Sequence, residues 1–367
     1  MNYSYWELKS WFSNIDFAII GSGIVGLTTA LHLKEKYPKS NILILEKGQL
    51  PNGASTKNAG FACFGSLSEI RNDLKTHSIQ EVIELVEKRW KGLSLLRQTL
   101  GDNAIRFEQL GGYELFNSES NLFEESVQGM SEVNSYLNSI FKADVFSIQS
   151  DEFGFSAIKK DLIFNKFEGQ IDTGKMMEAL LLKVQSKGIK ILNNTDVTYI
   201  DDFGNIQLNS DFSFQVDKIV IATNGFANQF LDENMKPARA QVLITQPIKD
   251  LHIKGTFHLD EGYYYFRNID NRILLGGGRN LDFKTEETTK FGTTELIQNK
   301  LEQLLSTIIL PNIEIEIAYR WSGIMGVGNQ KKAIVKQVSN NVYCGVRLGG
   351  MGIAIGSMIG KEIAELI

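Results

Sequence analysis

The 367-residue chain has little cysteine and no long apolar run. Its two cysteines, Cys63 and Cys344, are too few and too isolated for a disulfide framework or a cysteine-rich metal site, so we expect each to be a small buried residue. No stretch approaches about 18 consecutive apolar residues, which excludes a transmembrane helix. Residues 1–16 lack the basic start and the apolar middle of a signal peptide, so we expect a cytoplasmic protein.

The chain also lacks dense clusters of lysine and arginine. Its net charge of −5 and pI near 5.6 disfavour a nucleic acid or an anionic membrane surface as the partner and favour a small-molecule ligand. The histidines, His32, His77, His252 and His258, show no metal-ligand spacing, so we expect structural or surface roles for them and no metal. The length predicts two domains.

Residues 15–46 have the pattern of a unit that binds an adenine dinucleotide. The unit consists of an apolar strand 15–20, the turn Gly21-Ser22-Gly23-Ile24-Val25-Gly26, a helical stretch, a second apolar strand 42–45 and the acid Glu46. Gly21 allows the tight turn, Gly23 lets backbone N–H groups approach a pyrophosphate, and Gly26 lets the helix pack close to the sheet. The pyrophosphate then lies at the positive end of the helix dipole. Glu46, 20 residues after Gly26, is placed to accept both ribose hydroxyls.

Apolar spacing predicts most of the remaining elements. Helices are expected over 79–100, 122–141, 173–186 and 293–306, and a strand over 313–317. Aromatic, β-rich sequence from Val242 to Gly277, with a turn at Ile269-Asp270-Asn271, predicts an antiparallel sheet in a second domain. The loop from Lys47 to Ser68 is unusually long for an α/β unit, so we expect it to touch the ligand.

Three further segments, far apart in the sequence, favour FAD over a nicotinamide cofactor. They are Ser55-Thr56-Lys57-Asn58-Ala59-Gly60 after Lys47, Ala222-Thr223-Asn224-Gly225 at the end of a buried strand, and Gly349-Gly350-Met351-Gly352-Ile353 before the last helix. The first offers hydroxyls, an amide and open backbone, and the third directs a helix dipole at its neighbour. No second dinucleotide fingerprint is present, so no NAD(P)H site is expected.

In this order the segments resemble the FAD-dependent oxidoreductases of the D-amino acid oxidase and glycine oxidase superfamily, over nearly the whole chain. The resemblance implies an α/β fold, α+β overall, with a Rossmann-like FAD-binding domain of the glutathione reductase type 2 and a substrate domain built on an antiparallel sheet and helices. We expect a discontinuous FAD-binding domain at 1–78, 151–226 and 318–367. The substrate-binding domain is expected at 79–150 and 227–317.

The resemblance also implies cofactor contacts. The backbone of Val197 touches the adenine, the strand matching Ala222 to Gly225 lies beside the cofactor, and the glycine loop from Gly349 to Ile353 donates N–H groups to the pyrimidine end of the flavin. Reduced flavin is anionic there, so such donors stabilise the product of hydride transfer by roughly a few kcal/mol. Relatives that tether flavin use a His or Cys at places where this chain has neither, so we expect non-covalent FAD.

For the reaction, we expect hydride transfer from the C–N bond of a small amine or amino acid to flavin N5, giving an imine that hydrolyses. The substrate-pocket candidates are Tyr265, Arg267, Arg320, Trp321 and Arg347, and no catalytic residue is assigned among them. Salt bridges at the domain interface are the alternative role for the arginines, and plain sheet packing is the alternative for the aromatic strand.

Two departures from the relatives bear on substrate and electron acceptor. Met325 stands where glycine oxidase relatives place a carboxylate-binding arginine, which disfavours an α-amino acid. The runs Tyr265-Phe266-Arg267 and Arg320-Trp321-Ser322-Gly323 are more similar to the gamma-glutamylputrescine oxidase branch, which oxidises amines. Leu274 stands where methylated-amine oxidases place an oxygen-activating lysine, so oxygen, a quinone or a protein stays open as electron acceptor.

Two other functions stay open on the same architecture. One is a flavin dehydrogenase of a 2-hydroxy acid or a polyol, which would need a base for the hydroxyl proton, and no histidine lies in the segments expected to face the flavin. The other is a flavoprotein subunit of an electron-transfer complex, which the acidic composition permits. Fold alone does not choose among these functions, because function resides in the site.

Overall fold

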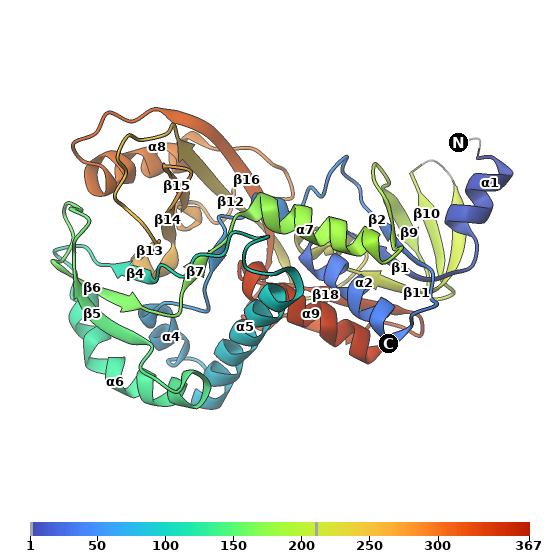
Figure 1. The fold of residues 1–367 in the computed structure, drawn as a ribbon, viewed down its shortest axis with the longest axis horizontal. Coiled ribbons are helices and arrows are strands. Elements are labelled where there is room, and N and C mark those ends of the chain that lie inside the picture. Colours follow the sequence, from blue (N-terminus) through green and yellow to red (C-terminus); the bar gives the residue numbers. More distant parts are fainter. Residues whose placement is uncertain (1–2, 210–211) are drawn as a thin grey trace.

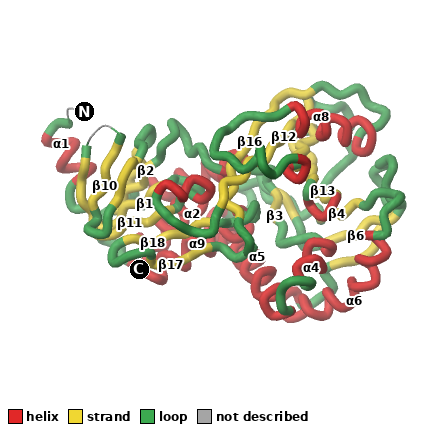
Figure 2. Tube along the Cα trace, turned by 180° about the vertical axis from the view of Figure 1, so that it is seen from behind, coloured by secondary structure: helices red, strands yellow, loops and turns green. Residues whose placement is uncertain are grey.

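Two sheets organise the chain into two lobes in the computed structural model, which describes residues 3–209 and 212–367 (Figures 1 and 2). The strands of the first sheet are β1 (Ile15–Ile20), β2 (Ile42–Leu45), β8 (Lys190–Leu192), β9 (Val197–Ile200), β10 (Asn205–Leu208), β11 (Ser213–Ile221), β17 (Ile334–Gln337) and β18 (Val342–Val346). The second sheet contains β4 (Gly112–Leu115), β5 (Phe146–Ser150), β6 (Asp161–Asn165), β12 (Lys236–Thr245), β13 (Thr256–Leu259), β14 (Tyr264–Ile269), β15 (Arg272–Gly277) and β16 (Ile317–Val327). Together they confirm the expected α/β architecture with a second, largely antiparallel sheet.

The helices connect and cover these sheets. The α-helices are α1 (Tyr5–Glu7), α2 (Ile24–Lys36), α3 (Ala54–Lys57), α4 (Leu67–Asp73), α5 (Ile79–Leu100), α6 (Leu122–Phe141), α7 (Thr173–Ser186), α8 (Glu295–Leu304) and α9 (Gly352–Leu366). Short 3₁₀ or π segments are η1 (Leu8–Phe12), η2 (Asn224–Gln229), η3 (Asp260–Gly262), η4 (Arg279–Leu281) and η5 (Leu305–Ile309), and β3 (Phe61–Ala62) pairs with β7 (Gly169–Gln170). Within the described residues, no helix is both long and apolar enough to span a bilayer.

The first sheet runs parallel in the order β8–β2–β1–β11–β18, with β17 antiparallel at one edge. Its central strands are almost entirely buried because both faces are covered. Helices α2, α7 and α9 pack on one face, and α5 lies against α9 between the two lobes (Figure 1). The β9–β10 meander and Phe12 pack on the other face. This arrangement brings the carboxyl ends of the parallel strands to one edge.

The second sheet has the order β16–β12–β15–β14–β13–β4–β6–β5. Its predicted hairpin is present between β14 and β15, where Asp270 and Asn271 both have positive φ, 47° and 56°. Positive φ at both central residues matches the twist of the flanking strands. Phe257 and Phe266 stack in its core with ring centroids 4.6 Å apart, under helix α8. The lobe therefore has a hydrophobic core of its own.

The structure differs from the expected boundaries in several places. β6, expected in the FAD-binding part, pairs with β4 and β5, and β16 pairs with β12 along nearly its whole length. α5, expected in the substrate domain, packs on α9: a Cβ added at Gly92 would lie 2.2 Å from the Ala354 carbonyl oxygen. Local patterns predict that a strand or helix forms, but long-range pairing decides the sheet or lobe to which it belongs.

The predicted helices α5, α6 and α7 are present with the expected bounds, whereas two other segments differ. The segment 313–317 is not a strand, since β16 begins only at Ile317. The long loop from Lys47 to Ser68 contains α3, β3 and the start of α4, because a serine N-cap at Ser66 starts α4 within it. Cys63 and Cys344 are free and buried, as expected.

Candidate functional site

An elongated cavity of about 1140 Å³ is lined by residues of both sheets. The predicted cofactor residues that line it are Gly21, Ser22, Gly23, Ile24, Val25, Glu46, Lys47, Ser55, Lys57, Asn58, Ala59, Gly60, Val197, Ala222, Thr223, Asn224, Gly349, Gly350, Met351, Gly352 and Ile353. Three predicted cofactor residues lie behind the wall and do not line the cavity: Gly26, Thr56 and Gly225. Segments separated by more than three hundred residues therefore share one cavity, as an extended ligand requires.

Three glycines in and just after the turn that follows β1 leave no room for a side chain. Gly21 has φ +103°, and a Cβ there would lie 2.9 Å from the Ala222 carbonyl oxygen. A Cβ at Gly26 would lie 2.0 Å from the Gly21 carbonyl oxygen, so any side chain would push α2 away from β1. A Cβ at Gly23 would lie 2.9 Å from the Ser55 hydroxyl oxygen. The turn thus keeps the N-terminus of α2 open to the cavity only with glycine at these places.

Glu46 lies at the end of β2, buried at the edge of the cavity. Its Oε2 accepts hydrogen bonds from the Ser22 backbone N–H, at 3.1 Å, and from the Ser22 hydroxyl, at 2.6 Å. Its Oε1 accepts from the Gly48 N–H at 2.9 Å. These donors fix the carboxylate in one orientation beside the glycine turn, so it is preorganised to accept further hydroxyl groups.

The segment from Ser55 to Gly60 is held against α2 and α7. The Ser55 hydroxyl accepts from the Ile24 N–H at 2.9 Å, which satisfies one free donor at the start of α2. The Asn58 side-chain oxygen accepts from the Gly60 N–H, at 2.9 Å, and from the Thr173 hydroxyl, at 2.8 Å. This part of the wall is therefore rigid before any ligand binds.

Aromatic side chains line the cavity where the second sheet faces it. They are Phe61, Tyr263, Tyr265 and Phe291. Tyr265 projects from β14, its ring centroid 5.5 Å from that of Phe61, and burial raises the pKa of its phenol to about 12. Ala59, Val242 and Leu274 form a small buried apolar cluster next to these rings. The phenol of Tyr265 is neutral at physiological pH and can only hydrogen-bond or pack.

His258 also lines the cavity, which the sequence did not indicate. It lies on β13, and its Nε2 is 2.6 Å from Oε1 of the buried Glu168. Burial opposes the imidazolium charge, but Glu168, with Glu114 and Glu69 behind it, outweighs burial and raises the pKa of His258. Because the two partners are 90 residues apart, no local spacing could have revealed the pair.

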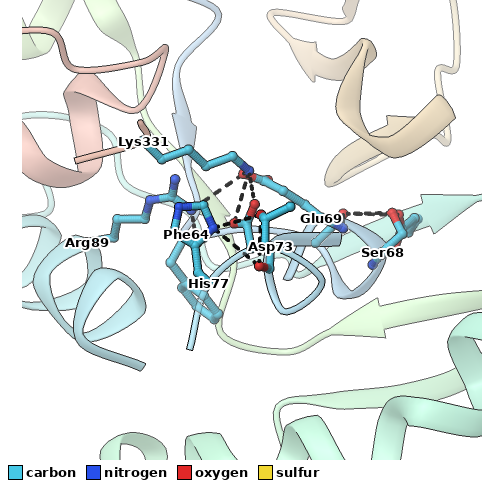
Figure 3. A network of polar contacts seen from close by, with 10 residues as sticks. Phe64, Ser68, Glu69, Asp73, His77, Arg89 and Lys331 are labelled. Atoms are coloured by element: carbon cyan, nitrogen blue, oxygen red, sulfur yellow. Dashed lines mark hydrogen bonds and ion pairs between the residues drawn. The ribbon is translucent and has the colours of Figure 1, made fainter. Parts of the chain in front are cut away.

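A second charged cluster lies beside it (Figure 3). Lys331, from the loop after β16, contacts Glu69 and Asp73 of α4, and Glu69 also lies 3.6 Å from Arg89. Arg89 donates to the Phe64 carbonyl oxygen at 2.7 Å. Burial opposes ionisation of Glu69, but Arg89 and Lys331 outweigh it and lower the pKa of Glu69 to about 2. The positive and negative side chains of this cluster therefore offset one another's charge.

Of the five substrate-pocket candidates, Tyr265 lines the cavity and the other four do not. Arg320 contacts Glu302 at 2.8 Å and Gln298 at 2.7 Å, so it stabilises the second lobe from outside the cavity. Trp321 donates its indole N–H to the Lys57 carbonyl oxygen at 3.0 Å and supports the wall from behind. These two residues therefore hold structure around the cavity rather than face it.

The two remaining arginine candidates are also placed behind the wall. Arg347 donates to backbone carbonyl oxygens of Asn234 and Lys332, at 2.8 Å and 2.9 Å, so its charge is used to tie loops together. Arg267 is buried next to Gly60, with one long contact of 3.5 Å to the Gly60 carbonyl oxygen. Burial lowers the pKa of Arg267 to about 10. Arg267 and Tyr265 share a face of β14, but Gly60 lies against the Arg267 guanidinium, and of the two residues only Tyr265 lines the cavity.

Among the described residues, no group of three or more His, Cys, Asp or Glu side chains could hold a metal ion. The carboxylates near His258 are instead paired with serine, lysine or imidazole groups. The chemistry available to the site is therefore that of a large cavity with a glycine turn and Glu46 in its lining, an aromatic wall and a histidine–carboxylate pair.

Comparison with known proteins agrees with this geometry. The family model described as FAD dependent oxidoreductase matches residues 16–366. Gamma-glutamylputrescine oxidoreductase of Escherichia coli (strain K12) is 21% identical, over 96% of this chain and 83% of the relative. Among solved structures, L-proline dehydrogenase from P. horikoshii and glycine oxidase from Geobacillus kaustophilus each have a TM-score of 0.74 at 18% identity, covering 96% of this chain and 93% and 94% of theirs. At this identity the two structures show a shared fold.

Proposed function

This chain belongs to the FAD-dependent oxidoreductase family, and on that premise we propose that it oxidises the C–N bond of a small amine. Bound FAD would supply the two-electron acceptor for the hydride. The amine becomes an imine, which water hydrolyses. The protein contributes binding, orientation and exclusion of water, because hydride transfer needs the α C–H held about 3 to 3.5 Å from its acceptor.

We assign the cofactor to the elongated cavity. Glu46 would accept the ribose hydroxyls, the start of α2 would hold the diphosphate, and Val197 would contact the adenine from the far end. The loop from Gly349 to Ile353, at the start of α9, would donate N–H groups to the pyrimidine edge of the flavin. The fit rests on two observations. The glycines of the turn place no side chain between the backbone N–H groups and the cavity, so an extended ligand can contact the backbone, and the Glu46 carboxylate is held in a fixed orientation beside them.

The observation that favours an amine over an α-amino acid is the composition of the cavity wall. A free α-carboxylate is usually bound by a paired arginine, yet Arg267, Arg320 and Arg347 all lie outside the lining. In the described part of the chain, Arg279 is the arginine that reaches it, and its guanidinium stacks over Phe283 at 4.7 Å. The aromatic rings offer an apolar surface for the carbon body of an amine. The relative named for gamma-glutamylputrescine supports the same substrate class.

The electron acceptor is proposed from the residues next to Tyr265. Leu274 lies in the apolar cluster with Ala59 and Val242, so this position offers no lysine to activate oxygen, and its cross-strand partner Arg267 is buried behind Gly60 and does not line the cavity. We therefore propose slow reoxidation by oxygen and faster reoxidation by a quinone or a protein acceptor. Stopped-flow mixing of the reduced protein with oxygen or with a soluble quinone distinguishes these acceptors.

Anaerobic mixing tests the substrate class. The FAD-loaded protein is mixed with primary and secondary amines, α-amino acids, 2-hydroxy acids and polyols, and flavin absorbance is followed near ~450 nm. We expect amines with an apolar body to bleach the flavin, and amino acids to do so at least about tenfold more slowly. Bleaching by hydroxy acids or polyols alone would replace the proposal by an alcohol dehydrogenase, and inert flavin with a co-purifying protein would indicate an electron-transfer subunit.

A further inference from the structure

We propose that His258 is the proton acceptor for the substrate ammonium group and that Glu168 is its positioning residue. The inference deepens the proposed amine oxidation and rests on it. An aliphatic amine with a pKa near ~10 enters the cavity mainly as an ammonium ion at neutral pH. Hydride can leave the adjacent carbon only when the nitrogen has a free lone pair, so the proton must first go to a group in the cavity.

His258 is placed to face such a substrate. On β13 it stands opposite Tyr265 of β14, and its ring centroid is 5.3 Å from that of Phe61. All three side chains line the same cavity. Nε2 is engaged by Glu168, whereas no hydrogen bond within the described residues reaches Nδ1. A ring nitrogen without a hydrogen-bond partner is either fully buried or accessible, and Nδ1 is not one of the fully buried atoms. It is therefore the ring nitrogen open to the cavity.

Glu168 fixes which nitrogen is basic. Its Oε1 accepts from the Thr256 hydroxyl at 2.8 Å as well as from Nε2 of His258 at 2.6 Å, and its side chain is 1% exposed. A Cβ added at Gly112 would lie 2.4 Å from Oε2, so the carboxylate is enclosed. A carboxylate that holds the Nε2–H leaves the lone pair on Nδ1, and it stabilises the imidazolium once a proton arrives.

The other charged groups around His258 keep their protonation state near neutral pH. Glu69 on α4 has a pKa of about 2 and is neutralised by Lys331 and Arg89. Tyr265 on the adjacent strand β14 has a pKa of about 12, so its phenol stays protonated. Neither group competes for the substrate proton over the physiological range.

Two buried groups complete the surroundings. Glu114, on the neighbouring strand β4, accepts from Ser66 and Ser68, and burial raises its pKa. Burial likewise raises the pKa of the Cys63 thiol well above its ordinary value, so Cys63 stays protonated. His258 therefore combines a ring nitrogen open to the cavity with a raised pKa, which brings it closer to that of an ammonium ion.

The proposed step balances without any added reactant. The ammonium N–H proton moves to Nδ1 of neutral His258, which becomes an imidazolium, and the electron pair of that N–H bond stays on the substrate nitrogen. The C–H pair then leaves as hydride to the oxidised cofactor, while the nitrogen lone pair forms the C=N bond. Water adds to the resulting iminium and releases the carbonyl product together with a protonated amine or an ammonium ion, so the positive charge stays on the nitrogen.

The pH dependence of flavin reduction tests this assignment. Anaerobic kred/Kd is measured between about pH 6 and about pH 10 for the wild type, His258→Gln and Glu168→Gln, with His252→Gln as control, since His252 is exposed and contacts only the Phe153 carbonyl oxygen. We expect the wild type to rise to a plateau above the pKa of His258. His258→Gln should instead rise about tenfold per pH unit up to the ammonium pKa.

For an amine with a pKa near ~10, the ratio of wild type to His258→Gln should therefore fall by about 100-fold between about pH 8 and about pH 10. Glu168→Gln should lower the pH at which the plateau begins, and His252→Gln should keep the wild-type profile. Parallel profiles for wild type and His258→Gln would overturn the assignment. A loss of kred/Kd that is the same at every pH and confined to carboxylate-bearing substrates would also overturn it, because His258 would then bind the carboxylate of the substrate. If no amine bleaches the wild type, the proposed function itself fails.

A second measurement does not depend on turnover or on the stability of the variants. In the FAD-loaded wild type labelled with ¹⁵N-histidine, His258 is identified by comparison with His32→Gln, His77→Gln and His252→Gln. We expect its neutral form to carry the proton on Nε2 and its pKa to lie above the ordinary value of about 6.5. A neutral form with the proton on Nδ1, or a pKa below that value, would contradict the proposal.

Discussion

Lys331 and Glu69 form an ion pair across 262 residues of sequence, with Lys331 Nζ 2.9 Å from Glu69 Oε1. The same Nζ lies 2.8 Å from Oδ1 of Asp73, so one lysine joins two carboxylates on successive turns of α4 (Figure 3). Lys331 and Glu69 both line the cavity. The pair therefore fastens the loop after β16 to α4 at the end of the cavity that contains His258.

Replacing Lys331 by methionine should lower the free energy of unfolding by about 1 to 2 kcal/mol at neutral pH, a value reduced because the lysine is 40% exposed. The stabilisation by ionised Glu69 is complete above about pH 4.5 and is lost as the pH falls toward its folded pKa of about 2. The wild type should therefore lose more stability than Lys331→Met between these pH values. Urea unfolding at both pH values measures this, with Lys332→Met as control. Equal acid sensitivity would show that the pair contributes nothing.

Glu46→Gln should weaken FAD binding while the fold is retained. The variant loses an ionised acceptor for Ser22 and for the ribose hydroxyls, which corresponds to about 1.5 to 3 kcal/mol, or roughly a 10- to 100-fold higher Kd. Quenching of FAD fluorescence on titration into the apoprotein measures the Kd. Glu35→Gln, on the exposed side of α2, serves as control. An unchanged Kd in Glu46→Gln would place the ribose elsewhere.

Tyr265→Phe should keep FAD and alter the response to amines. Its hydroxyl forms no hydrogen bond within the described residues and lines the cavity, so its removal affects the ligand rather than the fold. We expect about a tenfold change in the substrate Kd or in kred. Tyr264→Phe on the same strand is a matched control, because Tyr264 points into the core of the second lobe. If the two variants behave alike, Tyr265 does not face the substrate.

The buried pair Arg239 and Glu286 predicts a large effect on stability. Arg239 donates to both oxygens of Glu286, at 2.8 Å and 2.6 Å, and Glu286 is fully buried. Arg239→Met should cost about 3 to 5 kcal/mol because it leaves an unpaired buried carboxylate. The double variant Arg239→Met, Glu286→Leu should recover most of that loss, as measured by denaturant unfolding. A double variant as unstable as the single one would mean that packing, and not charge, dominates the site.

Much of the cavity wall around the glycine turn could be predicted from local sequence. The reason is that the glycine turn from Gly21 to Gly26 and the acid Glu46 belong to one short βαβ unit, in which spacing alone fixes geometry. The hairpin at Asp270 and Asn271 was predictable for a similar reason, since both residues tolerate positive φ. In such units the relevant contacts lie within a few tens of residues.

The part of the cavity that we propose binds the substrate could not be predicted in the same way. Arg320 looked like a pocket residue beside Trp321, but its charge is paired with Glu302 on the preceding helix. His258 looked structural, but it meets Glu168 in the cavity wall. In both cases the partner is supplied by a different element, so the role of the residue depends on which strands pair and which faces they present.

The sequence by itself therefore determined the dinucleotide-binding unit, its parallel strands and the positions of its glycines, because these follow from backbone sterics and short-range periodicity. The choice of flavin rested on segments far apart in the sequence and on the resemblance that they carry. Only the tertiary structure decided which charges face the cavity and which are neutralised behind it. The ionic character of Glu69, Arg267 and His258 depends on burial and on partners brought close by long-range strand pairing, and neither can be read from neighbours along the chain.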